Sequence, residues 1–235
     1  MLREYWDNAL WTVLQPMLDD DTSELVRGYI RAAFRRARPV IELWRCQAQA
    51  VPYINDEDRS SYCVKMPTSA GKTRIAEMAI LRCLLDNADD PRKKCLYVAP
   101  YRALATEVEN SLGHSFAPVG IRVSELYGGF DLNPAEVQVL EETRILIATP
   151  EKTDAFLRYK RDLADQVGLV VVVAVRTIGL TRRGLRYEFF LHRIVRRFAD
   201  QGVRVLFLSA VMPNEVQFTQ WITGRDVEHG LIWSE

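Results

Sequence analysis

From Tyr62 onward, short apolar runs alternate with longer stretches in which apolar residues recur at helical spacing. Apolar runs bounded by polar or turn-forming residues are typical of buried strands, and amphipathic stretches between them are typical of helices. The expected strands are residues 62–65, 95–99, 123–126, 145–148, 169–175 and 205–208. The expected helices are residues 73–85, 103–112, 134–139, 152–159, 187–198 and 214–223. Strands separated by helices predict an α/β fold with a mostly parallel central sheet and helices on both faces.

The first part of the chain has a different pattern, which predicts helices alone. Apolar residues recur at helical spacing from Trp6 to Met17, and three aspartates at 19–21 interrupt them. Thr22 or Ser23 can cap a second helix, which Pro39 would stop. We therefore expect a helical extension over residues 1–42, followed by the α/β domain over residues 43–235.

Composition narrows the classes of function. Hydrophobic residues make up 48% of the chain and charged residues 26%, as in ordinary globular domains. The 31 basic and 31 acidic side chains cancel, so a nucleic-acid site would have to be a local patch. Cys46, Cys63, Cys83 and Cys95 form no CxxC pair, which favours thiols in a reducing compartment over a zinc site. The charged start and the lack of an apolar run of about 18 residues predict a cytoplasmic protein.

The most specific motif is the segment VKMPTSAGKT at residues 64–73, between an expected strand and an expected helix. Main-chain N–H groups of such a loop point at phosphate oxygens, and the helix N-terminus adds positive potential. Gly71 permits close approach of the backbone, Lys72 would reach the β- and γ-phosphates of ATP, and Thr73 would place its hydroxyl on Mg²⁺. The general pattern has glycine where this chain has Met66.

Further motifs follow in an order that resembles superfamily 2 helicases. MPTSAGKT is similar to their motif I, APYRALATEV at 99–108 to motif Ia, ATPEKTDAFLR at 148–158 to motif Ib, and LSAVMPN at 208–214 to motif III. LWRCQAQAV at 43–51 is similar to the block before motif I, and LYGG at 126–129 to the glycine-pair block. An Ile-Gly pair, an Arg-Gly pair and Glu188 resemble the superkiller-like DExH subgroup. The resemblance covers residues 43–224 and implies the first RecA-like domain of such a helicase.

The resemblance also implies ATP and Mg²⁺ as cofactors and assigns roles to residues. Lys72 and Thr73 would be the catalytic residues of the phosphate loop, and Gln47 would read the adenine. Nucleic-acid contacts map onto Arg102, Gly128, Gly129, Thr149 and Lys152, although Arg102 and Lys152 alone would pass for ordinary surface charges. Coupling between the two ligands maps onto Ser209, Ala210 and Val211 of motif III. The ATP contacts map onto Gln47, Pro67, Thr68, Ser69, Ala70, Gly71, Lys72 and Thr73.

The hydrolysis motif of these helicases is missing. In the family the central strand ends in D-E-x-H, and the corresponding residues here are Val173, Ala174, Val175 and Arg176. One carboxylate should hold Mg²⁺ and the other should orient the attacking water, and a positioned acid or base contributes about 10²–10⁴ in rate. We expect ATP binding that is retained or weakened and hydrolysis near background. Two origins would explain such a sequence: the motif was changed deliberately, or the protein is a natural pseudo-ATPase.

The sequence leaves other functions open beside an ATP-dependent helicase or translocase domain. The first is a non-catalytic, nucleotide-responsive scaffold that binds nucleic acid or a protein. Trp6 and Trp11 could then form a docking face, although packing in the core is the simpler expectation for both. A P-loop kinase or small NTPase ranks far lower, because it has no need of motifs Ib and III. A helicase implies DNA or RNA, single-stranded, as partner, together with a second RecA-like domain or partner subunit.

Overall fold

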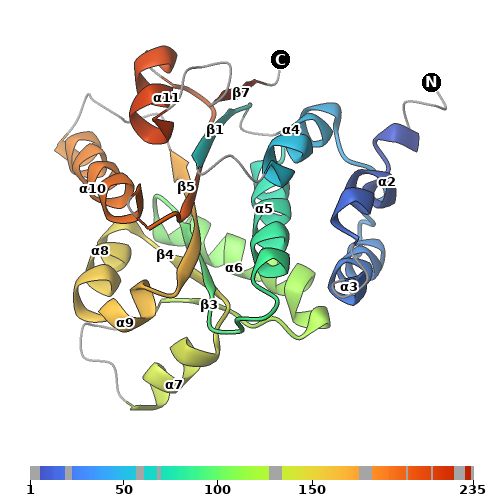
Figure 1. Ribbon diagram of the computed structural model, residues 1–235, viewed down its shortest axis with the longest axis horizontal. Helices are drawn as coiled ribbons and strands as arrows, with labels where there is room; N and C mark the ends of the chain where they lie inside the picture. The colour runs from blue at the N-terminus through green and yellow to red at the C-terminus, as the bar shows by residue number, and fades with distance from the viewer. Residues whose placement is uncertain are drawn as a thin grey trace.

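The computed structural model describes residues 6–18, 23–56, 61–67, 70–126, 134–174, 182–199, 201–212, 214–224 and 231–233. At its centre lies a seven-stranded sheet in the order β3-β4-β2-β5-β6-β1-β7 (Figure 1). Every pairing between these strands is parallel, which confirms the predicted α/β fold. The strands are β1 Ser61–Lys65, β2 Lys94–Val98, β3 Val123–Glu125, β4 Ile145–Ala148, β5 Val167–Ala174, β6 Arg204–Ser209 and β7 Leu231–Trp233.

Helices cover both faces of the sheet. On one face α5 and α6 pack against the strands, with α2, α3 and α4 outside them; α8, α9, α10 and α11 cover the other (Figure 1). The helices are α2 Leu10–Leu14, α3 Ser23–Phe34, α4 Arg45–Asn55, α5 Lys72–Asp86, α6 Arg102–Phe116, α7 Pro134–Glu142, α8 Pro150–Tyr159, α9 Arg161–Ala164, α10 Arg182–Ala199 and α11 Glu215–Thr223. Two short 3₁₀ helices, Gln15–Met17 and Ala117–Val119, follow α2 and α6.

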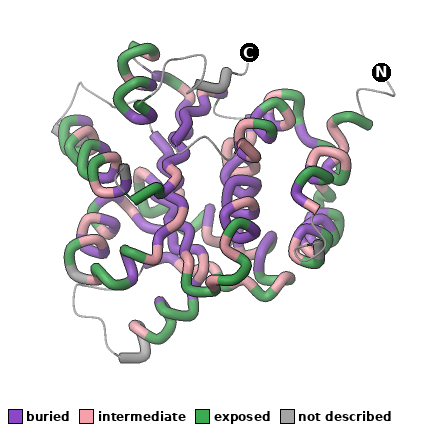
Figure 2. Tube along the Cα trace, in the orientation of Figure 1, coloured by how far each residue is buried: buried purple, intermediate pink, exposed green. Residues whose placement is uncertain are grey.

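Two apolar clusters form the core, one on each face of the sheet. Successive side chains of a strand point to opposite faces, so Val171 of β5 lies in the cluster with α5, and Val170 and Val172 lie in the cluster with α10. Because both faces are covered, the strands read as continuous apolar runs. Figure 2 shows the resulting band of buried residues along the strands and α5.

The expected strands and helices are all present. Strand ends agree with the prediction to within two residues, except that Val175 lies outside the described residues. The helices after β2 and β5 are several residues longer than expected. Helices α4 and α9 and the three-residue strand β7 were not predicted.

The N-terminal helices belong to the same core as the sheet. Leu10 and Leu14 of α2 and Tyr29 of α3 are fully buried in the cluster that contains α5 and α6. Trp6 and Trp11, however, are 70% and 44% exposed, so the expectation that they pack in the core is wrong. Trp11 lies on α2 between the buried residues Leu10 and Leu14, and Trp6 precedes that helix. The domain boundary at residue 42 stays a prediction.

A buried polar network joins α3 and α6 to α5. The carboxylate of Glu77 accepts hydrogen bonds from the Tyr29 hydroxyl (2.8 Å) and the Ser115 hydroxyl (3.0 Å). Arg74, three residues earlier on α5, and Arg36, just after α3, form ion pairs with the same carboxylate. Burial raises the pKa of Tyr29, and the negative charge of Glu77 raises it further. The N-terminal helices are thereby tied to the helix that follows the phosphate loop.

Candidate functional site

The phosphate loop leaves the carboxyl end of β1 and enters α5. Gly71, the residue before the helix, has a φ of 75°, a left-handed conformation that glycine adopts without strain. The Lys72 ammonium donates to the carbonyl oxygens of Met66 (3.2 Å) and Pro67 (2.8 Å). Partial burial lowers the pKa of Lys72 below its ordinary value. Thr73 lies in the first turn of α5, half-buried, and the predicted contacts Thr68 and Ser69 lie outside the described residues.

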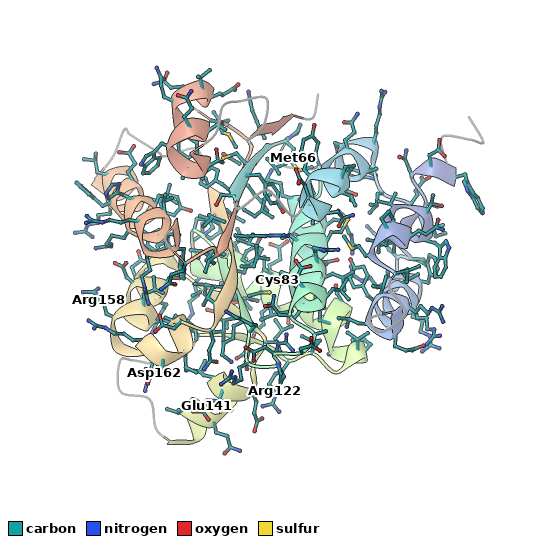
Figure 3. The ribbon with its side chains drawn as sticks, in the orientation of Figure 1. Met66, Cys83, Arg122, Glu141, Arg158 and Asp162 are labelled. Atoms are coloured by element: carbon teal, nitrogen blue, oxygen red, sulfur yellow. The ribbon has the colours of Figure 1, made fainter. Side chains whose placement is uncertain are left out.

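Met66, which stands where the general pattern has glycine, is accommodated by the core. Its side chain is buried in the same apolar cluster as Ala70 and Ile75, near the end of β1 (Figure 3). Its N–H donates to the carbonyl of Ser209 at 3.0 Å, which extends the pairing of β1 with β6 by one residue. The side chain that departs from the general pattern therefore packs in the apolar core.

Gln47 of α4 braces the phosphate loop. Its amide Nε2 donates to the carbonyl oxygens of Ala70 (3.0 Å) and Gly71 (3.5 Å), and its Oε1 accepts from the Trp44 N–H (3.1 Å). A Cβ at position 71 would displace this amide from its place against the loop, whereas the left-handed φ of Gly71 is what favours glycine there. Its predicted contact with adenine stays a prediction, because each polar atom of the side chain already has a partner within the protein.

Three strand ends meet beside the loop. In the register of the sheet, Ala174 of β5 lies opposite Ser209 of β6, which lies opposite Lys65 of β1. Val173 belongs to the cluster on the α5 face and Ala174 to the cluster on the α10 face, and both are 7% exposed. The Tyr187 hydroxyl donates to the Val173 carbonyl at 2.8 Å. The two positions at which the sequence predicts the missing carboxylates thus lie at the end of β5, with β6 between them and β1, and carry apolar side chains; Arg176 lies outside the described residues.

Motif III forms a tight turn after β6. The Ser209 hydroxyl donates to the carbonyl of Val211 (2.7 Å) and accepts from its N–H (3.2 Å). Ala210 lies between them, and the side chain of Val211 is exposed. Lys65 forms an ion pair with Glu215 of α11, a contact that sequence reasoning missed because the partners are 150 residues apart. This turn lies at the carboxyl end of β6, between that strand and α11.

The predicted nucleic-acid residues lie farther along the same edge of the sheet. Arg102 is the exposed first residue of α6, which follows β2. Thr149 precedes α8, which follows β4, and Lys152 is half-buried in its first turn. Strands β2 and β4 pair with Val98 opposite Ala148, so both helices begin at the same edge. Gly128 and Gly129 lie outside the described residues.

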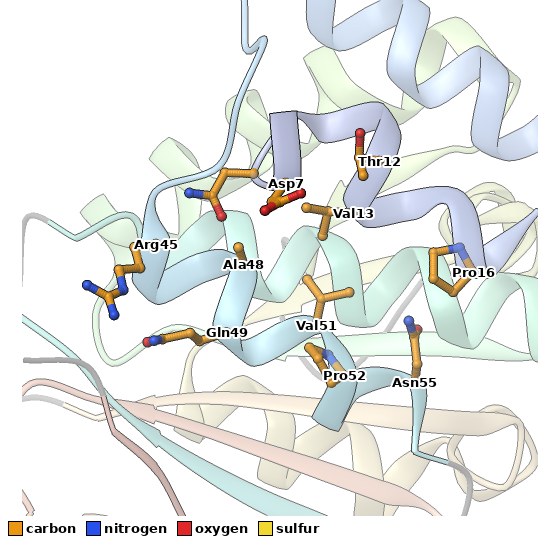
Figure 4. Close-up of a pocket in the computed structure, with 11 residues that line it drawn as sticks. Asp7, Thr12, Val13, Pro16, Arg45, Ala48, Gln49, Val51, Pro52 and Asn55 are labelled. Carbon is orange, nitrogen blue, oxygen red and sulfur yellow. The ribbon is translucent and has the colours of Figure 1, made fainter. Parts of the chain in front are cut away.

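The other side of α4 lines a groove that is separate from the phosphate loop. It has a volume of 920 Å³, and its lining includes Thr12 and Val13 of α2 on one side and Ala48, Gln49 and Val51 of α4 on the other (Figure 4). Gln47, which contacts the loop, is not among its lining residues.

The residues that the structure describes include neither a membrane-spanning helix nor a cluster of metal-binding side chains. No helix within them is long and apolar enough to cross a membrane. No group of three or more His, Cys, Asp or Glu side chains within them could hold a metal ion.

A phosphate loop between a parallel strand and a helix, in a sheet of this order, defines a RecA-like P-loop domain. The model of the family described as DEAD/DEAH box helicase matches residues 44–219. The chain belongs to this family, and its resemblance to superfamily 2 helicases is confirmed.

Relatives and solved structures agree with this assignment. The chain is 35% identical over 229 residues to Hachiman protein HamB of Bacillus cereus, which covers 96% of the chain and 20% of that protein. It is 29% identical over 187 residues to the ATP-dependent DNA helicase Hel308 of Methanocaldococcus jannaschii, covering 79% of the chain and 15% of that protein. The DEAD-box helicase Mss116 bound to ssRNA and UDP-BeF shares the fold, with a TM-score of 0.70, 20% identity, and coverage of 96% of this chain and 45% of that one. The chain thus spans a fifth or less of the length of these two relatives.

Proposed function

We propose that this chain is the ATP-binding first RecA-like domain of a helicase or translocase, in which nucleotide binding persists and hydrolysis is disabled. The observation that carries the proposal is the contrast between the two halves of the site. The phosphate-loop half has Gly71 in a left-handed conformation and Lys72 held at the loop. The hydrolysis half ends in the buried apolar residues Val173 and Ala174.

The loss of both carboxylates is large enough to decide the outcome. Removing a positioned acid or base costs about 10²–10⁴ in rate, and the first carboxylate would also hold the metal. Neither apolar side chain can polarise water or bind a cation. Turnover near background is therefore expected even where ATP is bound.

The donors present fit a nucleotide better than a resident Mg²⁺ ion. Mg²⁺ in such sites takes one or two protein carboxylates in addition to phosphate oxygens. The Thr73 hydroxyl is the protein donor that the motif supplies, and Val173 and Ala174 supply none. We propose that Mg²⁺ binds with the nucleotide, held by its phosphates and Thr73, and that ATP affinity depends only weakly on Mg²⁺.

Calorimetry and a turnover assay test the proposal. Titration with Mg-ATP should release measurable heat, Lys72→Ala should abolish it, and ATP hydrolysis by the unaltered chain should stay near background. Val173→Asp with Ala174→Glu, assayed with a second RecA-like domain supplied, should restore hydrolysis that nucleic acid stimulates. Turnover by the unaltered chain that Lys72→Ala abolishes would contradict the disabled site, and the absence of binding heat would contradict the nucleotide site.

Single-stranded DNA or RNA is the proposed partner, together with a second RecA-like domain or subunit. Arg102, Thr149 and Lys152 lie at the N-terminal ends of α6 and α8 at one edge of the sheet, where backbone phosphates can bind main-chain N–H groups and cations. Together with Gly128 and Gly129, these three residues make up the proposed nucleic-acid path. Ser209, Ala210 and Val211 would couple that path to the nucleotide. The cysteines Cys46, Cys63, Cys83 and Cys95 are free thiols, which suits the proposed cytoplasmic location.

The buried apolar end of β5 also favours a second candidate function, a nucleotide-responsive scaffold without turnover. Val173 and Ala174 pack in the two clusters, so the strand end is a stable part of the core. The same double substitution separates the two functions. Restored turnover supports the helicase lineage, whereas continued inactivity with intact ATP binding supports the scaffold.

A further inference from the structure

Helix α10 concentrates positive charge in a chain that has none overall. Its sequence RRGLRYEFFLHRIVRRFA contains six arginines and one glutamate, whereas the 31 basic and 31 acidic residues of the whole chain cancel. The helix packs on the sheet face shared with α8, α9 and α11, and its outer side is exposed (Figure 2). It is therefore a local basic patch of the kind that nucleic-acid binding by a neutral chain requires.

One side of α10 combines exposed arginines with an exposed aromatic ring. Arg186, Phe189, Arg193 and Arg196 recur at spacings of three and four residues, which places them on one side of the helix. Phe189 is 68% exposed and belongs to neither apolar cluster. Arg193 is paired with Asp154 of α8, but neither Arg186 nor Arg196 has an ion pair with any residue that the structure describes. Within the part of the chain that the structure describes, Arg186 and Arg196 thus form no ion pair, and Phe189 adds nothing to the apolar core.

A second aromatic surface lies beside the stripe that Arg186, Phe189, Arg193 and Arg196 form on α10. The ring of His192 stacks on Trp221 of α11, with ring centroids 6.2 Å apart and an interplanar angle of 9°. Both rings are partly exposed, and Trp221 also contacts Phe218 edge-on, which fixes its orientation. Flat rings next to arginines suit nucleic acid, because bases stack on aromatic rings and guanidinium groups pair with phosphates.

The position of α10 continues the proposed nucleic-acid path. Because α10 follows β5, its N-terminal half lies at the carboxyl edge of the sheet, where α8 begins with Thr149. The Arg193–Asp154 ion pair joins the two helices directly. The first turn of α10 contains no acidic residue, although acidic residues stabilise that end of a helix. This distribution of charge favours an external anion at the start of α10.

We propose that a single strand of nucleic acid leaves the α8 end of the path and crosses the outer side of α10. Arg186 and Arg196 pair with its phosphates, and Phe189 stacks with a base. The separation of ten positions between the two arginines corresponds to about 15 Å of helix, the length of a few nucleotides. The inference rests on the proposed nucleic-acid function and extends it to a surface outside the helicase motifs.

A double variant with a matched control tests this surface. Arg186→Glu with Phe189→Ala changes the stripe, and Arg31→Glu with Phe34→Ala makes the same changes at the same spacing on α3, on the opposite side of the sheet. Binding is measured by fluorescence anisotropy with strands of about 6 and about 20 nucleotides, as DNA and as RNA. The α10 variant should lose about tenfold in affinity for the longer strand, and its salt slope should fall by about 1. Affinity for the shorter strand and for every strand in the control should stay unchanged.

The outcomes separate the inference from the function on which it rests. If the unaltered chain binds no strand of either length, the nucleic-acid function fails. If it binds, but the α10 variant behaves like the control, the inference about α10 is overturned. Polyglutamate that competes as well as the longer strand would assign the surface to acidic chains in general and would also overturn it. Circular dichroism of each variant, with Arg186→Gln alone as a milder change, shows that loss of binding is not loss of fold.

Discussion

At the scale of single residues, the carboxylate of Glu77 has more hydrogen-bond and ion-pair partners than any side chain described at the candidate site. It is 1% exposed and contacts Tyr29, Arg36, Arg74 and Ser115 from two other helices and its own. A charge can be buried at this depth only when it is paired and hydrogen-bonded. Arg74 directly follows Thr73 of the phosphate loop, so the network also holds the first turn of α5.

Glu77→Gln should destabilise the protein strongly although it preserves the shape of the side chain. The substitution removes the negative charge and leaves Arg36 and Arg74 without a counter-ion, which costs about 3–5 kcal/mol in buried pairs. Denaturant unfolding followed by circular dichroism measures the loss. Glu107→Gln, on the exposed side of α6, is the control and should leave the midpoint unchanged. Equal midpoints for the two variants would show that the network does not stabilise the fold.

At the scale of elements, the sequence predicted what depends on local pattern. The strands agreed because each is an unbroken apolar run covered on both faces. Helix α4 was missed because Pro52 inside it and the motif-like sequence of the block hid its period. Strand β7 has three residues, too few to show an alternation. Gly71 and Lys72 were predictable because the motif states their roles.

The contacts that shape the site were not predictable in the same way. Gln47 braces a loop 23 residues away, and Glu77 meets Tyr29 across 48 residues. Such pairs depend on how helices pack, which no local spacing encodes. The sequence indicated Gln47 as a site residue but not its hydrogen bonds to Ala70 and Gly71.

The end of α7 depends on one buried lysine. The ammonium of Lys94, the first residue of β2, donates to the carbonyl oxygens of Leu140 (3.0 Å), Glu141 (2.8 Å) and Thr143 (2.9 Å). These carbonyls lie at the C-terminus of α7, where no N–H of the helix can reach them. Burial lowers the pKa of Lys94, and the positive charge of Arg144 lowers it further. The three carbonyls nonetheless give the ammonium a partner for each proton.

Lys94→Met should lower the local stability of α7 and leave the stability of the sheet nearly unchanged. The variant leaves buried carbonyls without donors, at about 1–3 kcal/mol for each unsatisfied group. Hydrogen exchange followed by mass spectrometry should show faster exchange in residues 134–142 and little change in β5. Lys93→Met, at the neighbouring half-buried position, is the control. Unchanged protection of α7 would rule out the capping role.

At the scale of the whole molecule, the helical extension and the RecA-like domain share one core. Leu10, Leu14 and Tyr29 lie in the same cluster as α5. The Leu43 N–H donates to the Asn8 carbonyl at 2.8 Å. The family match begins at residue 44, so it excludes helices that the core includes.

Deletion of residues 1–42 should therefore lower the free energy of unfolding of the remaining domain. Removal of Tyr29 and Arg36 breaks the Glu77 network, and the loss should be at least about 3 kcal/mol. Thermal and denaturant unfolding of the truncated chain measure it. Trp6→Ala with Trp11→Ala removes two large exposed rings from the same extension and should change stability by less than about 0.5 kcal/mol. A truncated chain as stable as the whole would make the extension an independent unit.

The order of the strands has a consequence for communication between the two ligands. The phosphate loop follows β1, and the residues proposed to bind nucleic acid follow β2 and β4. Strands β5 and β6 lie between β1 and β2 in the sheet. A signal from one end to the other crosses the ends of β5 and β6, and the described end of β5 carries the apolar side chains of Val173 and Ala174. We expect the remaining coupling, through the motif III turn at Ser209, Ala210 and Val211, to be weak, so that the two binding free energies nearly add. Such a chain would hold a nucleotide and a nucleic acid at once, and each would change the affinity for the other only slightly.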